Sequence, residues 1–132
     1  MALQATLKLE GKSYDVRDLE YEIEKSYTNN LKPSSIARGG IINFTILSPM
    51  DGNLVFHEWV LSKAEIKEGE FILPLTNGIK HVEKKLSFEK AHCVRLSENY
   101  SSFNESQLYM RLTITAAIID FGKGVKFTNC EL

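Results

Sequence analysis

Three histidines and two cysteines are the side chains in this sequence best suited to catalysis or metal binding. His57, His81 and His92 fall in no HExxH pattern and in no other spacing that gathers zinc ligands. His92 and Cys93 are neighbours, and in a strand neighbouring side chains point to opposite faces, so they cannot pair as base and nucleophile. We therefore predict no catalytic, metal-binding or cofactor-binding residues, and we expect no enzymatic activity.

The two cysteines, Cys93 and Cys130, lie in strand-like, partly apolar segments and show no CxxC spacing. A thiol without a partner in such a segment behaves as a small apolar side chain. We expect both to be buried and reduced, as in a reducing compartment.

Two segments have some potential to hold phosphate. Residues 38–40 (Arg-Gly-Gly) resemble a backbone anion nest, but the GxxxxGK[ST] pattern is absent and a strand follows where a phosphate loop needs a helix. The glycine pair instead predicts positive φ angles or close backbone contact where a loop enters a strand. Residues 80–85 form a basic patch without aromatic side chains for base stacking, so nucleic-acid binding is only a weak alternative.

The overall composition is that of a globular domain. The chain has 132 residues, of which 43% are hydrophobic, and its 16 basic and 17 acidic residues give a net charge of -1. A domain of this size buries enough surface to fold alone, and a near-neutral charge gives no general attraction to nucleic acid or anionic membranes. No apolar run approaches the roughly 18 residues that a membrane helix needs. We predict a single domain over residues 1–132, made in the cytoplasm.

The first part of the chain alternates between apolar and polar residues. Leu3, Ala5, Leu7 and Leu9 predict a strand with one face on a core. The next apolar run changes phase after residue 16, so one residue near positions 17 and 18 must be absorbed, and a β-bulge does this at little cost. Residues 28–40 lack periodicity and predict a long loop. Residues 41–48 predict a strand that residues 49–52 terminate.

Residues 53–62 (NLVFHEWVLS) predict the only helix. Asp51 or Asn53 can cap it, and Phe56 and Trp59 belong to one apolar stripe. A helix of about ten residues is marginal alone, so this stripe must pack on a sheet or on another subunit.

The second half of the chain predicts further antiparallel strands. Residues 71–75 alternate and lead to Asn77 and Gly78, a strong hairpin signal, while Pro74 places its strand at an edge. Residues 85–100 predict a strand with a kink near 89–90. Residues 108–118 place alternate apolar side chains, Ile118 included, on one face, and residues 121–124 turn into a short last strand. About eight strands and one helix predict an antiparallel barrel or sandwich.

The order and spacing of several segments resemble a known family. These segments are LKLEGKSYDV, KPSSIARGGI, FHEWVL, LSFEKAHCV followed by SENYSSF, and LTITAA. Together they resemble the haemolysin-coregulated (Hcp, TssD) tube proteins of bacterial type VI secretion systems, which are related in fold to phage tail tube proteins. The resemblance runs nearly end to end, and the FHEW segment and the PSS-to-RGG spacing carry most of it.

This resemblance implies a mainly β fold: a two-sheet antiparallel β-barrel flanked by one short helix. It also implies hexameric rings that stack into a hollow tube, which a contracting sheath propels out of the cell after assembly in the cytoplasm. The expected partners are other copies of the chain, sheath, tip (spike) and baseplate proteins, and secreted effectors, with no nucleic acid and no membrane insertion. A near-neutral charge and exposed strand edges are compatible with such self-assembly.

The resemblance also implies roles for particular residues. The long loop is expected to contact the adjoining ring, through Leu31, Lys32, Pro33, Ser34, Ser35, Arg38, Gly39 and Gly40. Phe56 and Trp59 anchor the helix either to its own barrel or to a neighbouring subunit, and the sequence does not separate these two alternatives. Alternation alone suggests that Arg111, Thr113 and Thr115 face the lumen, although ordinary solvent exposure predicts the same residues.

Two other functions remain open at this stage. The chain is alternatively a tube protein of a phage tail or of an extracellular contractile injection system. In a different class, it is a small-ligand-binding β-barrel, because closed antiparallel barrels can hold a ligand in their mouths.

Overall fold

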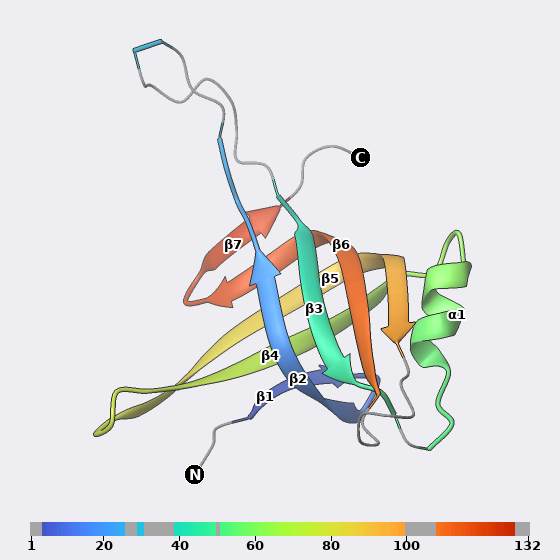
Figure 1. Cartoon of the computed structure of the whole chain (residues 1–132). Coiled ribbons are helices and arrows are strands. Elements are labelled where there is room, and N and C mark those ends of the chain that lie inside the picture. Colours follow the sequence, from blue (N-terminus) through green and yellow to red (C-terminus); the bar gives the residue numbers. More distant parts are fainter. Residues whose placement is uncertain (1–3, 26–28, 31–38, 50, 100–107, 129–132) are drawn as a thin grey trace.

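The alternating segments of the sequence form strands, and the computed structural model describes them over residues 4–25, 29–30, 39–49, 51–99 and 108–128. Within these residues the fold has seven strands and one helix, where the sequence had predicted about eight strands (Figure 1). The elements are β1 (Ala5–Leu9), β2 (Lys12–Tyr21), β3 (Ile41–Leu47), α1 (Val55–Leu61), β4 (Lys67–Thr76), β5 (His81–Asn99), β6 (Tyr109–Gly122) and β7 (Val125–Thr128).

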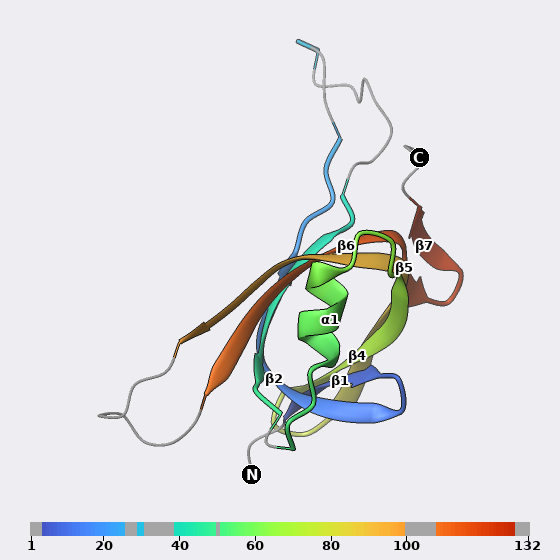
Figure 2. The ribbon, with the colours of Figure 1, turned by 90° about the vertical axis from the view of Figure 1, so that its right-hand side faces the viewer.

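The strands close into an antiparallel barrel. Their order is β3-β2-β1-β4-β5-β6-β7, and a further pairing of β3 with β6 closes the first six strands on themselves. Seen from the side, the barrel is two layers, with the end of β2, β3 and β6 in one and β1 and β4 in the other, and α1 lies at the side of the barrel that faces the viewer (Figure 2). This arrangement confirms the predicted two-sheet β-barrel with one flanking helix.

The longest strands bend from one layer into the other, and β2 does so at a bulge. Its register against β3 shifts between Val16 and Asp18, which confirms the β-bulge predicted near residues 17 and 18. Before the bulge β2 pairs with β1 on one side, and after it β2 pairs only with β3. The bulge therefore separates the part of β2 that pairs with β1 from the part that pairs with β3.

A second bend involves β5 and β6 together. Lys90 adopts a positive φ of 53°, at the position where the sequence predicted a kink. On one side of it Phe88 pairs with Ile119, and on the other Ala91 pairs with Ala116, and all four side chains are buried. In both strands, the alternation of buried and exposed side chains therefore shifts by one residue at this bend. The prediction that Ile118 continues the buried row was wrong, because Ile119 takes that place.

The β4–β5 hairpin projects from the barrel, as Figure 1 shows. Asn77 shapes its turn, because its side-chain oxygen accepts hydrogen bonds from the backbone N–H groups of Ile79 and Lys80. Strand β1 pairs with β4 only as far as Ile72, so on that side of β4 no strand of the described residues lies beside Pro74. Pro74 therefore does lie at a strand edge, as predicted, but only this end of β4 is an edge. Nearer the barrel, β4 lies between β1 and β5.

The core fills the interior of the barrel. Among the described residues, twenty buried apolar side chains from every strand and from α1 form one cluster. Its centre is aromatic: Phe44 and Phe71 pack edge to face with ring centroids 5.0 Å apart, and Trp59 stacks on Phe88 with centroids 6.5 Å apart. Such rings combine large buried area with defined geometry, so the helix and both layers share one core.

Candidate functional site

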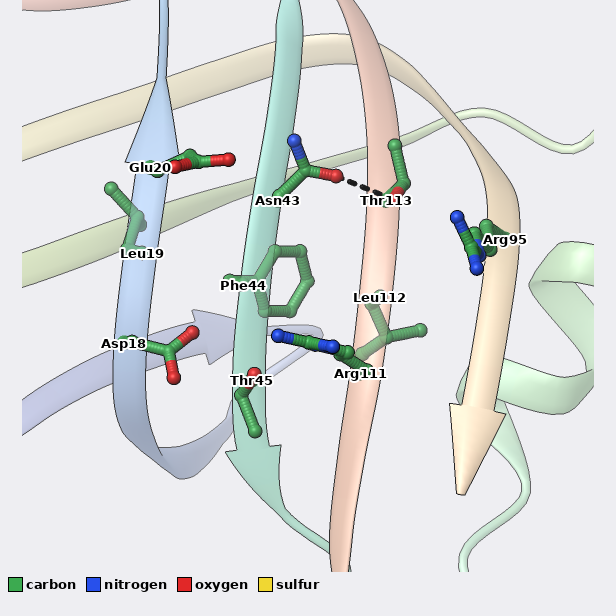
Figure 3. A pocket seen from close by; sticks show the side chains of 10 residues that line it. All are labelled: Asp18, Leu19, Glu20, Asn43, Phe44, Thr45, Arg95, Arg111, Leu112 and Thr113. Atoms are coloured by element: carbon green, nitrogen blue, oxygen red, sulfur yellow. Dashed lines mark hydrogen bonds between the residues drawn. The ribbon is translucent and has the colours of Figure 1, made fainter. Parts of the chain in front are cut away.

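The outward surface of one layer forms a broad polar face. It consists of the second half of β2, β3, the first half of β6 and the second half of β5, side by side in that order. We call this surface the four-stranded face. Its centre holds an open hollow of about 510 Å³ (Figure 3). The hollow is lined by Asp18, Leu19, Glu20, Asn43, Phe44, Thr45, Arg95, Arg111, Leu112 and Thr113.

Opposite charges occupy opposite sides of this face. Asp18 and Glu20 lie on β2, whereas Arg95 and Arg111 lie on β5 and β6, with β3 between them (Figure 3). In the middle, Thr113 Oγ1 donates a hydrogen bond to Asn43 Oδ1 at 2.6 Å. The face is therefore polar, and it exposes side chains of both charges.

The structure places Arg111, Thr113 and Thr115 on this face, opposite the buried row of β6. Arg111 and Thr113 line the hollow, and Thr115 pairs with Ile41 and His92 farther along the strands. Polar residues of the other strands complete the hollow, and they were not predicted from the sequence. These are Asp18, Glu20, Asn43, Thr45 and Arg95. The polar residues of β2 and β3 alternate with apolar ones, and this alternation carried the signal for the first four.

The predicted loop contact is described only at its base. Residues 31–38 lie outside the described residues, whereas Gly39 and Gly40 lie directly before β3. A Cβ on Gly39 would lie 2.7 Å from the carbonyl oxygen of Glu22. Gly40 has a φ of 96°, and its carbonyl oxygen accepts the backbone N–H of Ala116 at 2.6 Å. Close approach and a positive φ both require glycine here, as the sequence predicted.

Phe56 and Trp59 are fully buried against their own barrel. Phe56 packs edge to face on Tyr14 with ring centroids 5.0 Å apart, and Trp59 Nε1 donates a hydrogen bond to the carbonyl oxygen of Ala91 at 3.2 Å. The helix begins without a side-chain cap from its N-cap residue, Leu54. Asn53 instead accepts the Val55 backbone N–H and donates to the Tyr14 hydroxyl. The aromatic stripe therefore holds α1 within its own subunit.

A polar network ties α1 to the far end of β5. Glu98 accepts a hydrogen bond from Ser48 Oγ at 2.9 Å, and its other oxygen lies 3.2 Å from His57 Nε2. The serine and the histidine both contact the same carboxylate rather than each other. This arrangement links α1, β5 and the residue after β3, and it does not form a catalytic triad, in which the histidine must contact the serine directly.

Lys67 carries a buried positive charge beside the helix. Its ammonium group contacts the carboxylates of Glu10 and Glu65, and it lies 6.0 Å from the centre of the Trp59 ring. Burial alone would lower the pKa of Lys67, but the hydrogen bonds and charges of the two glutamates outweigh it and raise the pKa above its usual value. The pair of carboxylates keeps this lysine charged.

Cys93 is a free, buried cysteine, and burial raises the pKa of its thiol. It behaves as the sequence predicted, whereas Cys130 lies outside the described residues. In the described part of the chain, no three His, Cys, Asp or Glu side chains gather as a metal site. No helix found there is long and apolar enough to cross a membrane.

The four-stranded face ends in two strand edges that no other described strand covers. Residues 17–21 of β2 pair with β3 but not with β1, and residues 92–99 of β5 pair with β6 but not with β4. Such edges present unpaired backbone N–H and C=O groups to another chain. Helix α1 lies near the β5 edge (Figure 1).

The chain resembles known proteins over nearly its whole length. Residues 1–130 match the family model described as "Hemolysin coregulated protein Hcp (TssD)". Among solved structures, Hcp1 from Flavobacterium johnsoniae is 27% identical with a TM-score of 0.79, over 96% of this chain and 100% of that chain. Hcp1 from the E. coli EAEC 042 pathovar is 14% identical with a TM-score of 0.72, over 97% and 99% of the two chains.

A sheath-tube complex of an extracellular contractile injection system also contains a similar fold. That chain is 11% identical with a TM-score of 0.51, over 97% of this chain and 90% of that chain. Among curated protein sequences, none matches the chain significantly. Likenesses at 14% and 11% identity establish the fold alone, whereas the family match extends over nearly every residue. The chain therefore belongs to the Hcp (TssD) family, the structural tube proteins of type VI secretion systems.

Proposed function

We propose that six copies of this chain close into a ring and that the rings stack into the inner tube of a type VI secretion system. The observation that carries this proposal is the match to the Hcp family over residues 1–130 and to F. johnsoniae Hcp1 over 96% of the chain. Sheath and tip proteins and the baseplate are the expected partners of the tube, and secreted effectors are its cargo. The tube leaves the bacterial cytoplasm when the sheath contracts.

The two outer strand edges of the four-stranded face, which pair with no further described strand, support ring closure. Neighbouring strands in this face are all antiparallel, so β2 and β5 at its two sides also run in opposite directions. The β2 edge of one copy placed beside the β5 edge of the next would continue the antiparallel pattern. A contact between two different surfaces closes into a ring when its rotation allows, and strand addition is a common form of such a contact.

The four-stranded face is the surface that such a ring turns inward. Arg111, Thr113 and Thr115 then contribute to the wall of the lumen, together with Asp18, Glu20 and Arg95. A hydrated wall of mixed charge suits a passage for many cargoes, because it gives no single cargo a large apolar surface on which to bind.

The loop before β3 is proposed to make the contact between rings. The residues concerned are Leu31, Lys32, Pro33, Ser34, Ser35, Arg38, Gly39 and Gly40. Replacing Arg38 with Glu and shortening residues 34–37 should leave the rings folded and stop tube growth. Tubes of normal length from this variant, seen by electron microscopy, would refute the role of the loop.

Native mass spectrometry across a wide range of protein concentration tests the ring directly. We expect a hexamer that dissociates on dilution. A chain that stays monomeric throughout would contradict the proposal and favour the ligand-carrier alternative. That alternative has little support, because the core cluster fills the barrel and the described hollows are all on its surface.

A further inference from the structure

The tip of the β4–β5 hairpin presents apolar side chains to solvent. Leu75 and Val82 lie opposite each other across the hairpin, and Ile79 in the turn between them is 93% exposed. These three residues are called the hairpin tip below. An exposed isoleucine at the end of a projecting hairpin gains nothing for the fold of its own subunit, since it contacts no core.

The outer side of α1 presents a second exposed apolar surface. Leu54, Glu58 and Leu61 are spaced by four and three residues, so they follow one stripe along the helix, and all three are exposed. Ile66, just after the helix, is also exposed. These four residues are called the outer helix stripe. It faces away from the core, because Phe56 and Trp59 occupy the inner side of the same helix.

The two surfaces lie on opposite sides of the subunit. In Figure 1 the hairpin tip extends to the far left and α1 lies at the right, and in Figure 2 α1 faces the viewer with the hairpin behind. The β2 edge is on the side of the β4–β5 hairpin, and the β5 edge is on the side of α1 (Figure 1). Each side of the subunit therefore carries one strand edge and one apolar surface.

The two surfaces also carry opposite charge. Residues 80–85, around the hairpin tip, include three lysines and one glutamate. Around the outer helix stripe, Asp51 and Glu65 contact Lys12 and Lys67, so the exposed Glu58 is the carboxylate of the stripe itself. Lys80 is next to Ile79, and Glu58 lies between Leu54 and Leu61, so each apolar surface has a charge beside it that complements the other.

We propose that the hairpin tip of each subunit packs on the outer helix stripe of the next subunit around the ring. This contact rests on the ring of the proposed function and adds an outer contact beside the strand edges. Ile79 lies on the exposed leucines, and Lys80 approaches Glu58. Because the two surfaces differ and face opposite ways, the contact is heterologous and is repeated once for each subunit of a closed ring.

Substitutions in the two surfaces test this contact, with ring dissociation followed by native mass spectrometry and sedimentation. Ile79→Glu and Leu61→Glu should each raise the concentration at which the ring half dissociates by about tenfold or more. Val125→Glu is the matched control, because Val125 is an exposed apolar strand residue on β7, outside both surfaces. Glu58→Lys and Lys80→Glu should each weaken the ring, and the double variant should recover most of the lost stability.

Mixing the two glutamate variants tests whether the outer helix stripe binds the hairpin tip of a second copy of the chain. An Ile79→Glu subunit keeps an intact outer helix stripe, and a Leu61→Glu subunit keeps an intact hairpin tip. At a concentration where each variant alone is monomeric, the mixture should form heterodimers through the one intact contact. A mixture that stays monomeric overturns the contact.

The same experiments separate this contact from the ring itself. Rings of the unmodified chain that form normally and are insensitive to both glutamate substitutions overturn only the hairpin-to-helix contact. An unmodified chain that never forms a ring overturns the proposed function and this contact with it.

Discussion

Trp59 donates its indole N–H to the carbonyl oxygen of Ala91, and this bond of 3.2 Å joins the helix to β5 just beyond the bend at Lys90. Residue 91 is the last in β5 that pairs with β4. The indole therefore binds the strand at the point where its β4 partner ends. The same ring stacks on Phe88, so one side chain provides both the polar and the apolar attachment of α1.

Trp59→Ala should lower the free energy of unfolding by about 3–5 kcal/mol, because it leaves a cavity between the helix and both layers. Trp59→Phe keeps part of the apolar packing and loses the hydrogen bond, so its cost should be smaller, about 1–3 kcal/mol. Urea unfolding of the dissociated subunit measures both. Val125→Thr, at an exposed strand position, is the control and should change stability by less than about 0.5 kcal/mol. Equal costs for the two Trp59 variants would show that the packing of the indole contributes little.

Gly40→Ala should destabilise the fold more than alanine at any other described glycine of positive φ. A Cβ at Gly40 would lie 2.6 Å from the carbonyl oxygen of Ala116, and the backbone there has a φ of 96°. Gly124 has a similar φ of 81° with nothing within 4 Å, so Gly124→Ala isolates the cost of the φ angle alone, about 1–2 kcal/mol. The difference between the two variants in thermal unfolding measures the close contact. Indistinguishable melting temperatures would contradict it.

The sequence predicted most of the fold because the alternation in it is strong and local. It located the bulge after Val16 and the kink at Lys90 from changes of phase, which reflect the need to keep apolar side chains inward. It misplaced Ile118, because the bend in β5 is transmitted to β6 by pairing between strands that are distant in sequence. No window of sequence contains that pairing.

The candidate site was predicted only in part, because it too depends on pairing between strands that are distant in sequence. Arg111 and Thr113 were found from the alternation of a single strand. Arg95 and Glu20 were not, because a surface built from four strands depends on register, and register follows from the closed barrel. The family resemblance supplied the expected assembly, but the outer helix stripe became visible only once exposure was known for every residue of α1.

Lys67 should contribute stability that disappears only at high pH. Its pKa in the folded chain is raised above the unfolded value of about 10.4, so the charged form favours the folded state. That contribution is fully present below about pH 10.4 and is lost as the pH rises through the folded-state pKa. The stability difference between the unmodified chain and Lys67→Met should therefore be constant from about pH 7 to 9.5 and shrink above that range. Lys63→Met, at an exposed position, is the control for removing a lysine from this part of the chain. A Lys67 difference that stays constant beyond about pH 11 would refute the effect.

Cysteine labelling in assembled tubes should show which layer of the barrel lines the lumen. Thr113 lies on the four-stranded face, whereas Lys8 is exposed on β1 in the opposite layer. In a chain with Cys130→Ser, and with Cys93 buried, Thr113→Cys and Lys8→Cys each provide one accessible thiol. A small maleimide should label both in tubes, but a maleimide on a bulky polymer should label only Lys8→Cys, because the polymer is excluded from the lumen. In dissociated subunits the polymer should label both. Equal labelling of the two positions in long tubes would show that the four-stranded face does not turn inward, even if rings and tubes form.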